Sequence, residues 1–289
     1  MPRAARGTMT GMTARLPATA PVLVTGCSSG IGWAVVEHLL RGPRPVWATA
    51  RQPAALDPLA AQGARVLALD VTDEASMLAA VRAVEAEHGA VGALVNNAGY
   101  GEYGPVEEVP LDAVRRQFET NVFGLLRLTQ LVLPAMRTAG RGRIVNMSSM
   151  GGRMTLPGGG IYHASKYAVE ALSDALRFET RGFGIGVSVV APGPVLTGFV
   201  EEATAPGAGT GPYADFRRGV ARTNAAAYAG RRGTLDPDDV AAVVVEAIES
   251  DRPKPRYPVG FVSRQVVGAR RVLPTRLWDA ALRRQYPTP

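Results

Sequence analysis

Short apolar runs alternate along the chain with longer segments in which apolar and polar residues recur at helical spacing. The runs are rich in Val, Ile and Leu and only a few residues long, which is typical of buried strands. They predict strands at residues 21–25, 45–50, 65–69, 93–96, 143–147 and 185–190. The longer segments predict helices at residues 31–41, 73–88, 111–138 and 162–181.

Acidic residues mark several of the expected helix starts. Asp73 and Asp112 stand where a first helical turn needs an acceptor side chain, and Asp236-Pro237 predicts the start of a further helix. Strands that alternate with helices of this length imply right-handed crossovers in one parallel sheet. The predicted fold class is therefore α/β, a single doubly wound (Rossmann-like) parallel sheet with helices on both faces. Ligands of such sheets bind beyond the carboxyl ends of the strands.

The pattern predicts one domain over residues 21–262, preceded by a flexible leader at 1–20 and followed by an extension of the same domain at 263–289. Residues 198–234 break the rhythm because they are rich in Gly, Ala and Pro. A long irregular segment in a compact domain is a lid or binding loop, or else disordered. We favour a substrate lid.

Composition narrows the functional classes. With 46% hydrophobic and 20% charged residues, the chain can bury a large core, and a disordered polyampholyte is excluded. The single cysteine, Cys27, excludes a disulfide framework, and the three histidines, His38, His88 and His163, show no ligand spacing, so no metal site is expected. The absence of a long apolar run or a signal peptide predicts a cytoplasmic protein. The net charge of +7 is scattered along the chain, which argues against nucleic acid as a partner.

The first expected strand runs directly into Thr25-Gly26-Cys27-Ser28-Ser29-Gly30-Ile31-Gly32. Glycines allow a tight turn and close approach to a pyrophosphate, and the N–H groups of the following helix would point at that anion. The loop therefore indicates a dinucleotide site, although a plain glycine-rich turn would look similar. Cys27 is interpreted as a small loop residue, even though a helix N-terminus can lower a thiol pKa.

A tyrosine and a lysine lie four residues apart in Tyr162-His163-Ala164-Ser165-Lys166. Residues at this spacing share one helical face, so the phenol and the ammonium can reach one site. A neighbouring cation favours the phenolate and lowers the phenol pKa toward the range needed for acid–base work. His163 would point away from that face, and a structural role is expected for it.

The glycine loop, Asn96-Asn97-Ala98-Gly99, the pair Ser148-Ser149 and the Tyr162/Lys166 pair occur in one order and spacing. Together they resemble the short-chain dehydrogenase/reductase family, strongly over residues 21–200. Within it, Thr25–Gly32 and the strand end Trp47-Ala48-Thr49-Ala50-Arg51 are similar to bacterial relatives of hydroxysteroid and retinol dehydrogenases. The resemblance implies an NADP(H)- or NAD(H)-dependent oxidoreductase that interconverts a ketone or aldehyde and an alcohol.

The resemblance also implies roles for single residues. Tyr162 would be the general acid/base, and Lys166 would hold the nicotinamide ribose and lower the pKa of Tyr162. Ser149 would hydrogen-bond the substrate oxygen, with Ser148 as the competing choice. Asn121 would kink its helix and anchor a relay water. Asp70 and Val71 would contact adenine, Asn97, Ala98 and Gly99 would line the nucleotide site, and Pro192, Gly193, Val195 and Thr197 would close over the nicotinamide.

Arg51 bears on the choice between the two nucleotides. An acidic residue after the second strand binds the ribose diol of NAD, whereas a nearby arginine accommodates the 2′-phosphate of NADP. Here the strand ends in Arg51, with no carboxylate before Asp57, so the sequence favours NADP(H) while NAD(H) stays possible. Ser29 occupies the other position at which the family places a basic residue.

Several alternatives remain for the whole chain. A regulatory protein that senses NADP(H) without turnover is disfavoured, because such a protein would be expected to lose Tyr162 or Lys166. The apolar and basic residues of 259–284 could form an interfacial helix, but Pro274 interrupts it, so membrane contact is not expected. The expected partners are a hydrophobic carbonyl or alcohol substrate and further copies of the chain, in a homodimer or homotetramer formed through the helices at 111–138 and 162–181.

Overall fold

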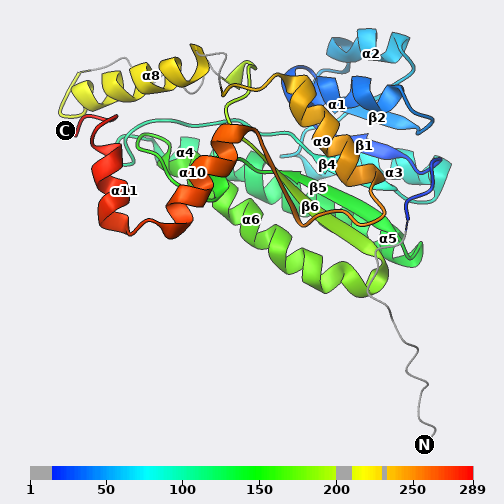
Figure 1. Cartoon of the computed structure of the whole chain (residues 1–289). Helices are drawn as coiled ribbons and strands as arrows, with labels where there is room; N and C mark the ends of the chain where they lie inside the picture. Colours follow the sequence, from blue (N-terminus) through cyan, green and yellow to red (C-terminus); the bar gives the residue numbers. More distant parts are fainter. Residues whose placement is uncertain (1–14, 200–209, 230–232, 289) are drawn as a thin grey trace, which may run out of the picture.

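The computed structural model describes residues 15–199, 210–229 and 233–288. Its strands pair in parallel into one seven-stranded sheet with the order β3-β2-β1-β4-β5-β6-β7 (Figure 1). The strands are β1 Val22–Val24, β2 Val46–Ala50, β3 Arg65–Ala68, β4 Ala93–Asn96, β5 Gly142–Met147, β6 Ile185–Pro192 and β7 Arg256–Val259. The order reverses between β1 and β4, as in doubly wound folds, and the predicted fold class is confirmed.

Helices connect the strands and extend the chain beyond them. They are α1 Gly30–Leu40, α2 Asp57–Ala61, α3 Glu74–His88, α4 Leu111–Phe118, α5 Leu125–Thr138, α6 Gly160–Thr180, α8 Ala214–Ala229, α9 Pro237–Glu249, α10 Phe261–Val272 and α11 Thr275–Leu282. A π-helical turn, Glu119–Gly124, joins α4 to α5, so the helix predicted at 111–138 is continuous through a local irregularity.

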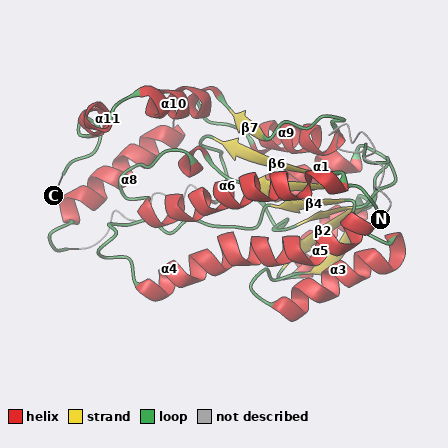
Figure 2. Cartoon of the chain, turned by 90° about the horizontal axis from the view of Figure 1, so that it is seen from below, coloured by secondary structure: helices red, strands yellow, loops and turns green. Residues whose placement is uncertain are grey.

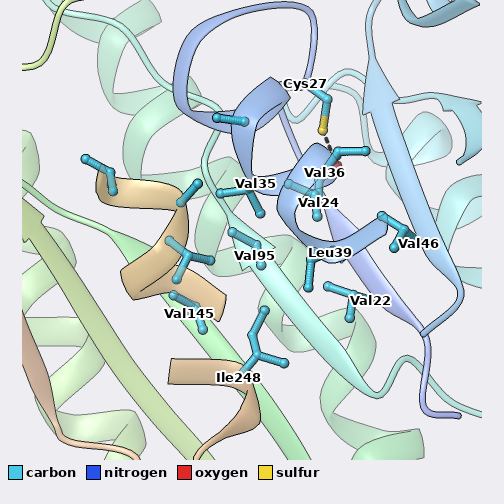
Figure 3. Packing of buried hydrophobic residues seen from close by; sticks show 14 of the residues in the cluster. Val22, Val24, Cys27, Val35, Val36, Leu39, Val46, Val95, Val145 and Ile248 are labelled. Carbon is cyan, nitrogen blue, oxygen red and sulfur yellow. Dashed lines mark hydrogen bonds between the residues drawn. The ribbon is translucent and has the colours of Figure 1, made fainter. Parts of the chain in front are cut away.

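The two faces of the sheet pack against different helices, because successive strand residues point to opposite sides. Val22 and Val24 belong to a core with α1 and α9, whereas Leu23 belongs to a second core with α3 and α5. Figure 3 shows the first of these cores, where Val35, Val36 and Leu39 of α1 meet the strand valines and Ile248 of α9. These residues are almost completely buried, so the strand runs read from the sequence are the inner layer of the molecule.

Cys27 belongs to the same core. Its thiol donates a hydrogen bond to Val24 O at 3.2 Å, and burial raises the pKa of the thiol to about 12. The interpretation as a small loop residue is therefore confirmed, since a reactive cysteine needs a thiolate.

The start of the chain corrects one expectation. Residues 15–20 were expected to belong to a flexible leader, but Leu16 is only 4% exposed and its carbonyl accepts from the Arg44 guanidinium. Arg44 also forms a bidentate pair with Glu249, at the end of α9, and Arg15 pairs with Asp251 at 3.2 Å. This stretch is thus tied to the domain. Residues 1–14 lie outside the described residues.

Elements late in the chain differ most from the sequence pattern. Residues 214–229, expected to be irregular, form α8, because alanine, counted there with loop formers, is the best helix former. β7 was missed because its four residues include Pro258, which is tolerated at the edge position that β7 occupies. The break at Pro274 is confirmed, since α10 ends at Val272 and α11 starts at Thr275. Residues 200–209 and 230–232 of the expected lid lie outside the described residues.

Three helix starts can be compared with the expected caps, and at α9 the N-cap is Asp236 with Pro237 as the first helical residue, as expected. Asp73 is the N-cap of α3, and its carboxylate accepts from Ala75 N at 2.9 Å. At α4 the N-cap is Pro110 instead, and Asp112 lies within the first turn, where it pairs with Arg116. Asp112 therefore lies in the first turn of α4, as expected, although it is not the N-cap.

The late helices gather at one end of the molecule. Figures 1 and 2 agree that α8, α10 and α11 lie together there, with the C-terminus beside α8. Gly219 of α8 lies against the C-terminal segment, since a Cβ at that glycine would approach Pro287 Cδ to 2.2 Å. Over the part of the chain that the structure describes, no helix has both the length and the apolar character to cross a bilayer.

Candidate active site

A cavity of about 1040 Å³ opens at the carboxyl ends of the strands, where the doubly wound fold places ligands. Nearly every residue singled out in the sequence contributes to its wall. The predicted residues that line it are Gly26, Ser28, Ser29, Gly30, Ile31, Arg51, Asp70, Val71, Asn97, Ala98, Gly99, Ser149, Tyr162, Lys166, Pro192, Gly193, Val195 and Thr197. The remaining two, Gly32 and Asn121, lie directly behind lining residues.

The glycine loop forms one end of this cavity. Gly26 has a φ of +69°, and a Cβ on it would lie 2.9 Å from Ala98 Cα. At Gly32 a Cβ would lie 2.2 Å from Gly26 O, so the turn closes only with glycine there. Thr25, which the sequence reading left without a role, fixes the loop to the next strand end, because its hydroxyl accepts from the backbone N–H groups of Asn97 and Ala98, both at 3.0 Å.

The first turn of α1 faces the same space. Ser29 is the N-cap in an extended conformation, and Ser28, Ser29, Gly30 and Ile31 all line the cavity. The N–H groups that begin a helix lack intrahelical acceptors and carry the positive end of its dipole. A side chain at Gly30 would fill the space beside Thr197, whose Cγ2 would be 3.0 Å from its Cβ. These residues therefore fit the pyrophosphate of a dinucleotide.

Tyr162 and Lys166 share one face of α6 and are 7% and 6% exposed. The Lys166 ammonium donates to Met147 O at 3.0 Å and lies 5.8 Å from the Tyr162 ring centre. Burial lowers the pKa of Lys166 to about 8, so the amine is still mostly a cation at neutral pH. The structure thus places a buried positive charge next to a phenol.

The two candidate serines differ in their surroundings. Ser149 is half-buried after β5, and its Oγ accepts from Gly151 N at 3.1 Å. Ser148 is buried, donates to Ser149 O at 3.4 Å and packs closely on Gly152, where a Cβ would lie 2.6 Å from its Oγ. Both serines border the cavity, but Ser149 is the more open of the two.

Asn121 lies in the π-helical turn, a feature that often marks functional sites. Its amide nitrogen donates to Tyr100 O at 2.9 Å and to Ser165 Oγ at 3.1 Å, and its Oδ1 accepts from Tyr100 N at 3.1 Å. Ser165 in turn donates to Tyr162 O at 2.7 Å. Asn121 therefore couples the segment after Gly99 to the helix that carries Tyr162.

Gln117 extends this network, and Asn96 forms a separate hydrogen bond between two strand ends. Gln117 donates to Ser165 Oγ at 3.2 Å and accepts from Glu102 N at 2.7 Å. Asn96 donates to Asn146 Oδ1 at 2.9 Å, which joins the ends of β4 and β5. Sequence reasoning missed Gln117, because a glutamine in a helical pattern looks like part of a solvated face, whereas here it is fully buried.

Aromatic rings surround Tyr162. Tyr103 stacks on it with ring centres 5.6 Å apart and 29° between the planes, and Phe199 lies 5.1 Å away. His163 was expected to point away from this face, but it lines the same cavity beside Tyr162, and its Nδ1 donates to Gly151 O at 3.2 Å. Burial lowers the pKa of His163 to about 4, so the ring is neutral at pH 7.

Late parts of the chain also contribute to the wall of the cavity. Asn224, Ala227 and Tyr228 of α8 line it together with Tyr286. Burial raises the pKa of Tyr228 to about 12 and also raises that of Tyr286, so both phenols stay neutral. Nothing in the local sequence marks Tyr286 as a site residue, because only the path of the C-terminal segment brings it there.

The remaining predicted contacts lie near the glycine loop. Arg51 directly follows β2 and its side chain is exposed at the cavity rim. Asp70 accepts from both the N–H and the hydroxyl of Thr72, at 2.9 and 2.7 Å, which fixes the turn that presents Val71. Among the described residues, no group of three or more His, Cys, Asp and Glu side chains could hold a metal ion.

Comparisons with known proteins agree with this architecture. The family model for short chain dehydrogenases matches residues 20–207. The oxidoreductase YbbO of Escherichia coli is 38% identical over 262 residues, which cover 90% of this chain and 93% of that protein. An NADPH-dependent 3-dehydrocapnine reductase of Ornithobacterium rhinotracheale is 34% identical over 268 residues, covering 89% and 94%.

Solved structures show the same likeness. A short-chain dehydrogenase from Streptomyces avermitilis superposes with a TM-score of 0.77 at 33% identity, covering 92% of this chain and 96% of that one. A short-chain dehydrogenase/reductase from Burkholderia phymatum in complex with NAD superposes with a TM-score of 0.75 at 27% identity, covering 94% and 97%. The chain belongs to the short-chain dehydrogenase/reductase family of oxidoreductases.

Proposed function

We propose that the protein is an NADP(H)-dependent reductase of ketones or aldehydes, which also catalyses the reverse oxidation of the alcohol. One observation carries this proposal. Ser149, Tyr162 and Lys166 line the same cavity as the glycine loop. The glycine loop would hold the pyrophosphate of the dinucleotide, whose nicotinamide would supply the hydride when bound. The protein's task is then to position the carbonyl and to supply one proton.

Tyr162 is proposed to give its phenolic proton to the carbonyl oxygen during reduction and to take it back during oxidation. Ser149 donates a second hydrogen bond to the same oxygen, which stabilises the negative charge that builds up there. The Lys166 cation favours the phenolate left on Tyr162. Asn121 holds the backbone of Tyr100 and, through Ser165, the turn of α6 that carries the phenol.

The preference for NADP(H) rests on Arg51. A guanidinium at the rim of the adenosine end can bind a 2′-phosphate with two charge-assisted hydrogen bonds. Asp70, the nearest acidic residue of the cavity wall, is already engaged with Thr72. The NADPH dependence named for the Ornithobacterium relative supports this choice, and the NAD complex of the Burkholderia protein supports the alternative.

α8 is proposed to act as the substrate lid. Its buried Arg217 forms an ion pair with Glu108, and Tyr213 donates to Glu107 at 2.7 Å, so the helix is fastened across the substrate end. Because Ala227 and Tyr228 present mostly apolar surface there, the substrate is expected to be hydrophobic.

The decisive test is turnover by the Tyr162→Phe variant with a panel of ketones and NADPH, followed by the loss of NADPH absorbance. We expect kcat to fall about 100-fold or more, since general acid catalysis contributes at least that much. The dissociation constant for NADP⁺, measured by calorimetry, should stay within a factor of about two to three. The matched control is Tyr257→Phe, which removes the hydroxyl group of another buried tyrosine. Tyr162→Phe turnover above a tenth of the wild-type value would refute the assignment.

A further inference from the structure

A second cavity, of about 820 Å³, adjoins the catalytic cavity at the loop before α6. Leu156 and Pro157 line both cavities. We call the second cavity the tail groove, and its apolar wall consists of Val106, Leu156, Pro157, Phe216, Trp278 and Leu282. Its volume falls within the range of about 300 to 1,000 Å³ that is usual for small-molecule sites.

Two of the three charged side chains that line the tail groove contact its own aromatic residues, and the third is Asp279. The Glu107 carboxylate accepts from the Tyr213 hydroxyl at 2.7 Å. The Arg270 guanidinium lies 5.8 Å from the centre of the Trp278 ring, within the range of a cation–π contact. The groove therefore suits an apolar occupant better than a charged one.

Three segments run from the catalytic cavity into the tail groove. In α8, Tyr228 lines the first and Phe216 the second, and in the C-terminal segment Tyr286 and Trp278 do the same. The third segment is the 155–160 loop. Figures 1 and 2 show α8 and α11 side by side at this end of the molecule. The tail groove thus lies beside the catalytic cavity, with Leu156 and Pro157 in the wall of both.

The two cavities meet at a closely packed joint. Val220 of α8 is buried against Gly158, where a Cβ would lie 2.6 Å from Val220 Cγ1. Gly104 N also donates to Gly158 O at 2.7 Å, which fixes the loop at this point. An occupant that reaches both cavities must be narrow at the joint, a condition that a chain of methylenes meets and a fused ring system does not.

We propose that the tail groove holds the unbranched alkyl chain of a substrate whose carbonyl lies at Tyr162. This inference rests on the proposed carbonyl reduction and names its substrate class. Each methylene buried in the groove leaves water, which lowers the free energy of the bound substrate and raises kcat/KM.

Chain length provides the first test. With NADPH and 2-alkanones from 2-butanone to 2-dodecanone, kcat/KM should rise by up to about fourfold for each added methylene. 2-Decanone should exceed 2-decalone, a fused-ring ketone with the same number of carbons, by tenfold or more. A flat series, or equal values for 2-decanone and 2-decalone, would overturn the proposal.

A matched pair of variants locates the effect. Val106 in the tail groove is 68% exposed, and Val272, outside its wall, is 77% exposed, so a glutamate at either position should leave the fold intact. Val106→Glu should abolish most of the gain for long ketones and leave 2-butanone unchanged, whereas Val272→Glu should match the wild type throughout. If kcat/KM for the ketone series were the same in the two variants, the proposal would be refuted. If Val106→Glu lowered the mass of the assembly in light scattering instead, the groove would be a contact between copies.

A binding measurement separates this inference from the proposed reaction. Trp278 lines the groove, whereas Trp33 and Trp47 lie on α1 and β2, so 1-dodecanol should change a fluorescence signal that Trp278→Phe removes. Turnover of 2-butanone without this signal would refute the tail groove and leave the reductase standing. The signal without turnover of any ketone would refute the reductase and retain an alkyl site. If neither the fluorescence change nor ketone turnover were observed, both the alkyl site and the reductase would be refuted.

Discussion

At the residue scale, burial sets the charge of the groups around Tyr162. The pKa of Lys166 is lowered to about 8 and that of His163 to about 4, in both cases chiefly by desolvation. At pH 7 the lysine is therefore largely protonated and the histidine neutral. The phenol has one cation on its own helical face and an uncharged ring at its side, which favours proton transfer at Tyr162 itself.

The buried His163 should make stability depend on pH. Its pKa is about 4 in the folded chain against an ordinary 6.5. Between these values the unfolded chain binds a proton that the folded chain excludes, so the free energy of unfolding falls as the pH falls from 6.5 to 4, by up to about 3 kcal/mol. His163→Asn, which keeps a donor for Gly151 O, should remove this part of the fall in urea unfolding at pH 7, 6 and 5. An identical fall in both proteins would contradict the assignment.

Arg51 should decide the choice between the two nucleotides. Arg51→Ala removes the charge-assisted bonds proposed for the 2′-phosphate, so KM for NADPH should rise about 10- to 100-fold while KM for NADH changes little. Arg41, exposed after α1 and outside the cavity wall, supplies the control variant Arg41→Ala. The prediction is wrong if both Michaelis constants rise together.

At the element scale, Asp73 and Asp112 occupy different positions at the starts of their helices, although the sequence pattern around them is similar. Asp73→Ala removes the cap of α3 and should lower the free energy of unfolding by about 1 kcal/mol. Asp112→Ala, in the first turn after Pro110, removes an exposed pair with Arg116 and exposed backbone hydrogen bonds, and should cost less. Thermal or urea unfolding of the two variants measures the difference, and kcat should not change in either. A larger loss for Asp112→Ala would reverse this reading.

Some elements could be predicted from the sequence and others could not. A buried strand such as β1 was predictable because both of its faces are apolar, and the glycine loop was expected in the site because it follows the carboxyl end of that strand. Ser165 and Gln117 were not predictable as a pair, because their hydrogen bond joins two helices distant in sequence. β7 escaped because a four-residue edge strand with a proline carries almost no periodic signal.

At the scale of the whole molecule, apolar side chains remain exposed on the helices expected to join copies of the chain. Phe178 of α6 is 79% exposed and Phe123 of the π-helical turn is also exposed. We expect light scattering to give a multiple of the 30.4 kDa chain mass, and Phe178→Arg to lower it. Phe261→Arg, at an exposed phenylalanine of α10, should leave the mass unchanged. Dissociation by the second variant alone would move the interface to the C-terminal helices.

The path of the chain through the cavity separates two tasks. The glycine loop and the residues around Tyr162 all precede residue 200, whereas α8 and Tyr286 add wall residues from the last third of the chain. A graft of the C-terminal third from a homologue would accordingly redirect which ketone is accepted while the nucleotide stays the same. Exchange of the one stretch of gene that encodes the C-terminal third would then be enough to change the range of substrates.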